Sequence, residues 1–122
     1  MTVSIDLFRN AEEVEEYAAG ERIFEEGRPG DRMYGVKTGE VEIAVRGRPV
    51  ETVGPGGIFG EMALIDSHPR SATALARTDC VVVPVNAKRF AFLVQQTPMF
   101  ALQVMRIMAE RLRRMDARIG SP

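Results

Sequence analysis

Glycines and prolines divide the first two thirds of the chain into short segments, and this punctuation constrains the fold more than any other feature. Val41, Ile43 and Val45 alternate with Glu and Ala, the period of two that a half-buried strand shows. Other strand candidates are ERIFEEG, MYGVKT, VETV, SATALAR and CVVVPV, separated by turns at Thr38–Gly39, at RGRP and at PGG. Several short strands at close spacing predict an antiparallel sandwich, jelly roll or barrel.

The pattern becomes helical after Asn86, where Pro98 separates two segments of helical composition. In the second segment, apolar residues alternate at spacings of four and three, as in the seam of a coiled coil. They are Ala101, Met105, Met108, Leu112, Met115 and Ile119. This helix is expected either to form a homodimer or to pack only on its own β-body. The predicted organisation is an N-terminal tail with a short helix (1–19), a mainly β body (20–86) and C-terminal helices (87–119).

Length and net charge limit the classes of protein to which the chain can belong. The 122 residues suit one domain. A net charge of −1, from 16 basic and 17 acidic residues, makes nucleic acid an unexpected partner. No secretory signal pattern and no apolar run near the ~20 residues that span a bilayer are present, so the expectation is a cytoplasmic protein without a membrane partner. The single cysteine, Cys80, begins an apolar run and is expected to be buried.

The stretch GIFGEMALIDSHPRSAT places Glu61 after a glycine and Arg70 after a proline. One acid and one guanidinium do not form the carboxylate pair of general acid–base catalysis. The chain's only histidine, His68, cannot form a histidine cluster for a metal, and no nucleophile-elbow or phosphate-loop motif is present. The prediction is therefore a protein that is not an enzyme and holds no metal.

An anion site is the functional interpretation of the same stretch. GEMAL can form one helical turn whose first N–H groups lack partners, and Arg70 can grip phosphate oxygens through two N–H groups. Glu61 would repel a phosphate and so needs a donor of its own, for which a ribose hydroxyl is suitable. A phosphate beside a sugar hydroxyl indicates a nucleotide. The structural alternative is an ion pair between Glu61 and Arg70 across a loop.

The residues FGEMALIDSHPRSATA (59–74) closely resemble the phosphate-binding cassette (59–73) of the cyclic nucleotide-binding domain family, which includes the catabolite activator protein, protein kinase A regulatory subunits and cyclic-nucleotide-gated channels. This chain meets every fixed position of the pattern F-G-E-x-A-L-x-x-x-x-P-R-[ST/A]-A-[ST]. The upstream segment 20–43 looks like the β-roll signature of the family. Its matching residues are Gly20, Phe24, Gly27, Gly30, Asp31, Tyr34, Gly39 and Val41.

The resemblance implies a mainly β fold, an antiparallel, jelly-roll-like β-roll of about eight strands flanked by an N-terminal and two C-terminal helices. It implies that cyclic AMP or cyclic GMP binds inside the roll. Arg70 would pair with the cyclic phosphate, and Glu61, beside Gly60, would accept the ribose 2′-hydroxyl. Backbone N–H groups of Gly60, Ala63, Ser71 and Ala72 would complete the cradle. The last helix, Met99 to Arg118, would be a lid or dimer axis, with Arg111, Leu112, Arg114 and Met115 as candidates for touching the base.

The function implied is a cyclic nucleotide sensor that shifts its C-terminal helices on binding and signals through a partner protein or a dimer. Ser71 is compatible with either base, and cyclic AMP is the favoured ligand. The alternatives are a β-roll interaction or dimerisation module that has lost nucleotide binding, and the sensor fragment of a longer transcription factor or channel. No helix-turn-helix, kinase or channel segment follows before Pro122.

Overall fold

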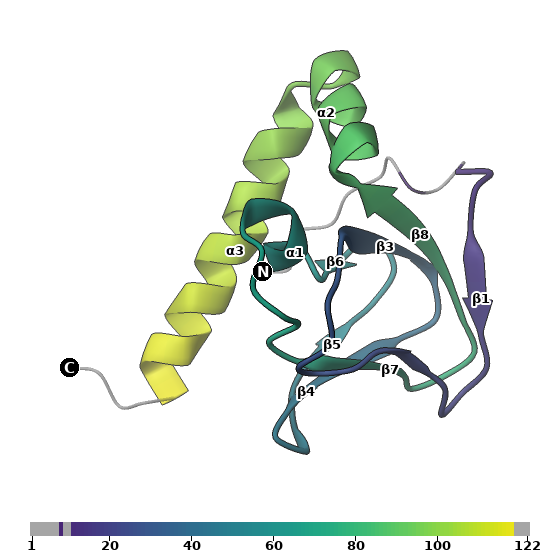
Figure 1. The fold of residues 1–122 in the computed structure, drawn as a ribbon, viewed down its shortest axis with the longest axis vertical. Helices are drawn as coiled ribbons and strands as arrows, with labels where there is room; N and C mark the ends of the chain where they lie inside the picture. The colour runs from purple at the N-terminus through teal and green to yellow at the C-terminus, as the bar shows by residue number, and fades with distance from the viewer. Residues whose placement is uncertain (1–7, 9–10, 119–122) are drawn as a thin grey trace.

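The computed structural model describes residue 8 and residues 11–118 of the chain. Its strands form two four-stranded antiparallel sheets with the orders β1-β8-β3-β6 and β2-β7-β4-β5. The three helices of the described chain lie to one side of this β-roll (Figure 1). The elements are β1 (Glu15–Tyr17), β2 (Arg22–Phe24), β3 (Arg32–Thr38), β4 (Val41–Val45), β5 (Arg48–Val53), β6 (Ile58–Phe59), α1 (Met62–Ile65), β7 (Thr73–Ala76), β8 (Cys80–Asn86), α2 (Ala87–Gln96) and α3 (Met99–Arg118). The predicted antiparallel β-roll of about eight strands is confirmed.

Apolar side chains from both sheets meet inside the roll and form its core. The buried members are Tyr34, Val36, Val41, Val53, Phe59, Ala74, Ala76, Cys80 and Val82. The alternation of Val41 and Ile43 directs both toward this interior, as the period of two predicts. Cys80 is buried here, in agreement with the sequence.

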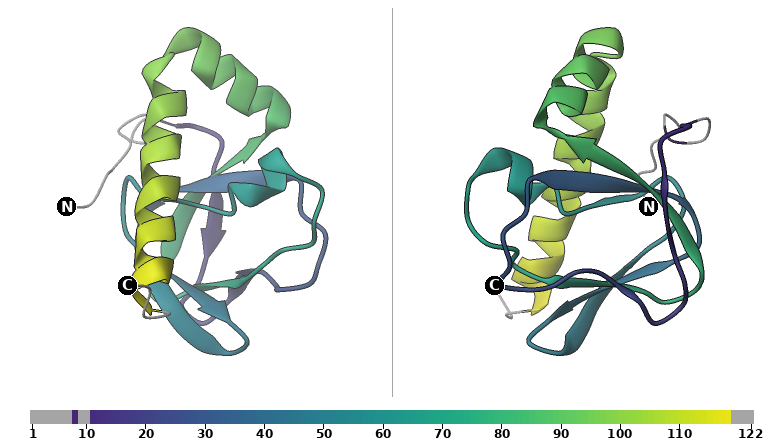
Figure 2. Two further views of the ribbon diagram at one scale, coloured as in Figure 1. Left: turned by 90° about the vertical axis from the view of Figure 1, so that its left-hand side faces the viewer. Right: turned by 45° about the vertical axis from the view of Figure 1, so that its right-hand side comes forward.

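A second core lies between the helices and the sheet formed by β1, β8, β3 and β6. It contains Phe8, Met33, Ile58, Val83, Val85, Phe100, Val104 and Ile107. Phe100, Val104 and Ile107 follow the helical spacing of four and three, so one stripe of α3 faces the β-body. Figure 2 shows α3 running along one side of the roll, from the α2 end toward the β4–β5 hairpin. This packing brings the C-terminal half of α3 beside β5.

The chain turns near each predicted turn, although β5 begins at Arg48 within the predicted turn 46–49, and adjacent strands do not always pair. β3 and β4 flank the predicted turn at Thr38–Gly39 yet belong to different sheets. β4 and β5 form a true hairpin. Its turn residues Arg46 and Gly47 have φ angles of 52° and 78°, as expected for the tight hairpin turns that match strand twist.

Residues 1–19, predicted as a tail and a short helix, contain a strand where the prediction allowed only tail or helix, whereas the backbone at Phe8 is 3₁₀-helical. Glu15–Tyr17 is strand β1, which pairs with Cys80–Val82 of β8. A helix here would place Glu12 and Glu16 four residues apart on one face, where like charges repel. The extended form instead pairs its backbone with a sheet edge. Residues 1–7, 9 and 10, which the prediction also covered, lie outside the described residues.

Only part of the predicted apolar seam on α3 packs against the rest of the protein. Ala101 and Met108 are half-buried, whereas the side chains of Met105, Leu112 and Met115 are exposed. The sixth seam position, Ile119, lies outside the described residues. α3 therefore packs on the β-body with one stripe and leaves part of a second apolar stripe in contact with solvent. No helix in the described part of the chain is both long and apolar enough to cross a membrane.

Candidate functional site

Two charged residues, Glu61 and Arg70, are buried in the cassette segment, with exposed fractions of 7% and 8%. β6 leads into Gly60, whose φ of 76° turns the chain before the four-residue helix α1. A loop then returns to Arg70 just before β7. The predicted single helical turn is confirmed by α1. The segment thus brings one acid and one guanidinium to the edge of the β-roll interior.

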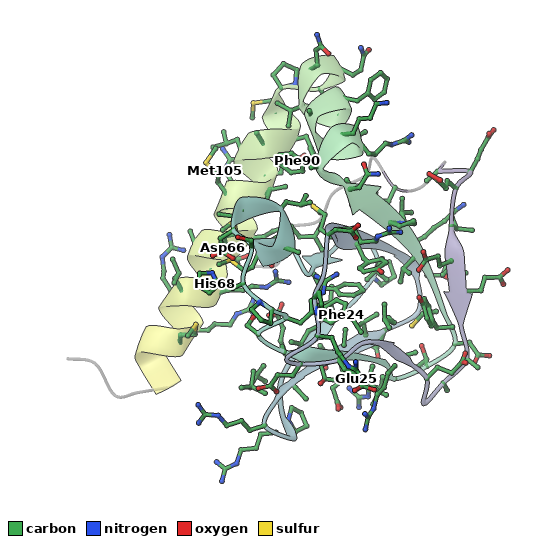
Figure 3. The ribbon with its side chains drawn as sticks, viewed as in Figure 1. Phe24, Glu25, Asp66, His68, Phe90 and Met105 are labelled. Carbon is green, nitrogen blue, oxygen red and sulfur yellow. The ribbon has the colours of Figure 1, made fainter. Side chains whose placement is uncertain are left out.

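Arg70 lies against the aromatic residues that fill the roll. Its Nη1 donates to Gly60 O at 3.1 Å and its Nη2 to Arg32 O at 2.8 Å. Its guanidinium carbon is 3.9 Å from the centroid of the Phe24 ring, within the range of a cation–π contact. Figure 3 shows Phe24 among the side chains inside the roll. Two carbonyl groups and an aromatic face therefore hold the guanidinium in one orientation.

Two glycines make room for this guanidinium. A Cβ atom at Gly30 would collide with Nε, Cζ and Nη2 of Arg70. A Cβ at Gly60 would lie 2.8 Å from Arg70 Nη1 and 3.1 Å from the Phe24 ring. Glycine is needed at both positions because a side chain would occupy the space of the arginine.

The charge of Arg70 is not neutralised by any described residue. No carboxylate in the described chain forms an ion pair with it, and its buried Nε has no hydrogen-bond partner there. Burial lowers the pKa of the Arg70 guanidinium below its ordinary value, and electrostatic interaction with Tyr34 and Asp31 opposes this shift without reversing it. A buried cation with a spare donor is a site that an anion would complete.

Glu61 is paired with α3 and not with Arg70. Its Oε1 accepts a hydrogen bond from Nη1 of Arg111. The same guanidinium grips Glu51 on β5, with Nε 2.9 Å from Oε1 and Nη2 3.1 Å from Oε2. The alternative of a Glu61–Arg70 ion pair is therefore wrong, because each residue has different partners. Arg111 links β5, the cassette and the C-terminal helix.

The other cassette residues named from the sequence lie around this site. Ala63 is in α1, and its N–H donates to Gly60 O at 3.3 Å. Ser71 and Ala72 form the bend between Arg70 and β7. Their predicted roles in a phosphate cradle, with that of Gly60, stay predictions.

The four candidates for a base contact are separated by the structure. Arg111 reaches Glu61 at the site. Arg114 is half-exposed, with Nη1 3.6 Å from Glu51 Oε2. Leu112 and Met115 are exposed by 62% and 60%. Their roles toward a base stay predictions, but α3 as it lies here brings only Arg111 and Arg114 to the acidic residues of the site.

Glu51 is the site residue that sequence reasoning missed. It is two residues from the buried Val53 on β5, and residues two apart lie on the same face of a strand. An acidic residue at an inward position of a strand is unusual because burying a carboxylate without a partner is costly. The alternation of residues along this strand could therefore have identified Glu51 as a site residue.

His68, the only histidine, lies on the surface of the cassette loop. Its Nδ1 is 3.1 Å from Asp66 Oδ1, and its side chain is 83% exposed. Asp66 and His68 lie near α1 in Figure 3. In the described part of the chain, no cluster of three or more His, Cys, Asp or Glu side chains is placed to hold a metal ion.

Comparisons with known proteins agree with this geometry. Residues 14–97 match the family model described as the cyclic nucleotide-binding domain. The chain is 33% identical over 104 residues to a CRP-like cAMP-activated global transcriptional regulator of Mycobacterium tuberculosis, a match that covers 81% of this chain and 46% of that protein.

Solved structures show the same fold. The catabolite activator protein of Thermus thermophilus superposes with a TM-score of 0.77 and 31% identity, covering 88% of this chain and 53% of that one. A structure described as cAMP-bound PfPKA-R (141-441) gives a TM-score of 0.73 and 28% identity, covering 88% and 37%. The chain thus spans about half the length, or less, of these relatives.

Proposed function

The chain belongs to the cyclic nucleotide-binding domain family, and we propose that it is a cyclic AMP-binding sensor that signals through its C-terminal helix. The observation that carries the proposal is the buried guanidinium of Arg70, which no described carboxylate neutralises and whose Nε has no partner. A singly charged cyclic phosphate supplies the missing acceptors and offsets the cost of burying the cation. The described chain holds no comparable unpaired buried cation elsewhere.

The ribose is assigned to Glu61. Arg111 holds Oε1 of this carboxylate, and Oε2 accepts no hydrogen bond from the described residues. A 2′-hydroxyl donating to Oε2 forms a hydrogen bond with a charged acceptor. Cyclic AMP is preferred over cyclic GMP in this proposal because the regulator of M. tuberculosis is described as cAMP-activated and the PfPKA-R structure as cAMP-bound.

The output of the sensor is assigned to α3. Arg111 ties this helix to Glu61, so a ligand at Glu61 acts next to a contact that holds α3 in place. The exposed stripe of Met105, Leu112 and Met115 provides a surface for a second copy of the chain or another protein. Figure 3 shows Met105 pointing from α3 away from the β-body. The proposed role is regulatory binding, without catalysis.

Calorimetric titration of cyclic AMP into nucleotide-free protein tests the proposal, with cyclic GMP as competitor. Arg70→Ala removes the buried partner of the phosphate and should cost about 2–4 kcal/mol, or roughly 30- to 1,000-fold in affinity. Arg22→Ala is the matched control, since this arginine is 62% exposed. It should bind as the unaltered protein does.

Each outcome has a distinct meaning. Binding that collapses in Arg70→Ala and persists in Arg22→Ala supports the anion site, and the competitor ranks the two bases. An unaltered protein that binds neither nucleotide would remove the proposal and favour a β-roll interaction module. If α3 signals, NMR spectra of the free and bound protein should differ along α3, and unchanged α3 resonances would remove that part of the proposal.

A further inference from the structure

Glu51 is a half-buried carboxylate that the proposed function leaves without a role. Its side chain is 17% exposed on the inward face of β5, next to Val53, which is buried. It accepts hydrogen bonds from Arg111 and lies 3.6 Å from Nη1 of Arg114. A half-buried acidic residue with two arginines of one helix beside it has a role beyond solubility, since fully exposed charges would provide solubility without the cost of desolvation.

The contacts of Arg111 show how Glu51 influences the position of Glu61. Glu51 accepts hydrogen bonds from the edge of the Arg111 guanidinium that carries Nε and Nη2. Nη1 then points to Glu61, and Nη2 also donates to Ile58 O. A guanidinium is planar and rigid, so a carboxylate held by two parallel N–H groups fixes its plane. With that plane fixed, the direction in which Nη1 meets Glu61 is fixed as well.

We infer that Glu51 is a positioning residue for ligand binding: it orients Arg111, and Arg111 in turn orients Glu61 for a ligand hydroxyl. This inference rests on the proposed function, because it concerns the hydroxyl assigned to Glu61. Glu61 is anchored through Oε1, which leaves Oε2 at a defined place for the incoming donor. Glu51 itself does not touch the ligand and acts only through Arg111.

Glu51 also affects an anionic ligand simply by its charge, and that effect must be separated from positioning. Removing a negative charge near the site favours any anion, whether or not it carries a 2′-hydroxyl. Positioning of Glu61 matters only to a ligand that has the hydroxyl. The ratio of the affinities for cyclic AMP and 2′-deoxy-cyclic AMP cancels the first effect and measures the second.

The experiment is calorimetric titration of both nucleotides into five proteins of full chain length. They are the unaltered protein, Glu51→Gln, Arg111→Gln, the double variant, and Glu42→Gln as a control that removes a carboxylate from the neighbouring strand β4. In the unaltered protein, cyclic AMP should bind about 10- to 100-fold more tightly than the deoxy nucleotide, as expected for a hydrogen bond to a charged group. Glu42→Gln should keep this ratio.

Glu51→Gln should lower the ratio to within about threefold of unity, because Arg111 no longer fixes Glu61. In the Arg111→Gln background, adding Glu51→Gln should leave the ratio where Arg111→Gln puts it, since Glu51 acts through Arg111. A sixth protein, Arg111→Lys, keeps the charge but loses the planar fork and should lower the ratio in the same way. If Glu51→Gln does not fold, an Arg111→Lys protein that keeps the full ratio overturns the inference.

The outcomes separate this inference from the proposed function. If the unaltered protein binds neither cyclic AMP nor cyclic GMP, the proposed function fails and the inference fails with it. If cyclic AMP binds and Glu51→Gln keeps the full ratio, the inference alone is overturned. Equal weakening of both nucleotides in Glu51→Gln also overturns it, because that result indicates a general structural or charge effect.

Discussion

The space that Gly30 leaves for Arg70 gives the sharpest test of how the site is built. Alanine at this position should dislodge the guanidinium, because its Cβ would collide with Nε, Cζ and Nη2 of Arg70. The backbone of Gly30 lies outside the left-handed region, so alanine introduces no backbone strain of its own. The substitution therefore moves an arginine without removing it.

The expected magnitude follows from the contacts that Arg70 would lose. They are its hydrogen bonds to Gly60 O and Arg32 O and its contact with the Phe24 ring. Each hydrogen bond from a charged donor contributes about 1.5–3 kcal/mol, and the ring about 0.5–2 kcal/mol. Rehydration of the displaced guanidinium offsets part of this loss. We expect the free energy of unfolding to fall by about 1–3 kcal/mol, and the affinity for cyclic AMP by at least about tenfold.

Urea unfolding followed by circular dichroism measures the stability, since the chain contains no tryptophan for fluorescence. Calorimetry measures the affinity. Gly54→Ala is the matched control, because a Cβ there would meet nothing within 4 Å and the backbone is again outside the left-handed region. If Gly30→Ala matched Gly54→Ala in both measurements, the Arg70 guanidinium would not lie against Gly30 in the folded protein.

Two further predictions concern α3. Leu112→Glu should convert a dimer formed through the exposed stripe into a monomer, whereas Phe92→Glu on α2 should not; both side chains are exposed, by 62% and 51%. Sedimentation equilibrium measures the molecular mass of each protein in solution. An unaltered protein that is already monomeric would contradict the prediction of a dimer through α3. Phe100→Ala should lower the free energy of unfolding by about 3–5 kcal/mol, because this ring is fully buried between α3 and the β-body. Phe92→Ala should change it by less than about 0.5–1 kcal/mol in the same urea titration.

The fold could be predicted from local patterns where one face of an element is buried. The alternation in β4 and the glycines and prolines between strands predicted an antiparallel sandwich, jelly roll or barrel, the family resemblance narrowed this to a β-roll, and Pro98 marked the boundary between α2 and α3. β6 has only two residues, too few to show a period. β1 was missed because pairing with β8, and not local composition, makes residues 15–17 a strand.

The part of the site that lies within one continuous segment of sequence could be predicted. Glu61 and Arg70 stand in a motif of continuous sequence, and both are buried as a site requires. Their partners could not be predicted in the same way. Glu51 and Arg111 are 60 residues apart, and only the packing of α3 beside β5 brings them together. No local period encodes such a contact.

Arg111 shows what this dependence on packing means for signalling. The family resemblance made it a candidate for touching the base, whereas the structure joins it to the carboxylate assigned to the ribose. The docking of α3 and the carboxylate to which the proposal assigns the ribose therefore share one guanidinium. By thermodynamic reciprocity, if a bound nucleotide changes the free energy of docking α3, then docking α3 changes the affinity for the nucleotide by the same factor. Under the proposed function, a partner that holds α3 in place therefore changes the affinity for the nucleotide by that same factor.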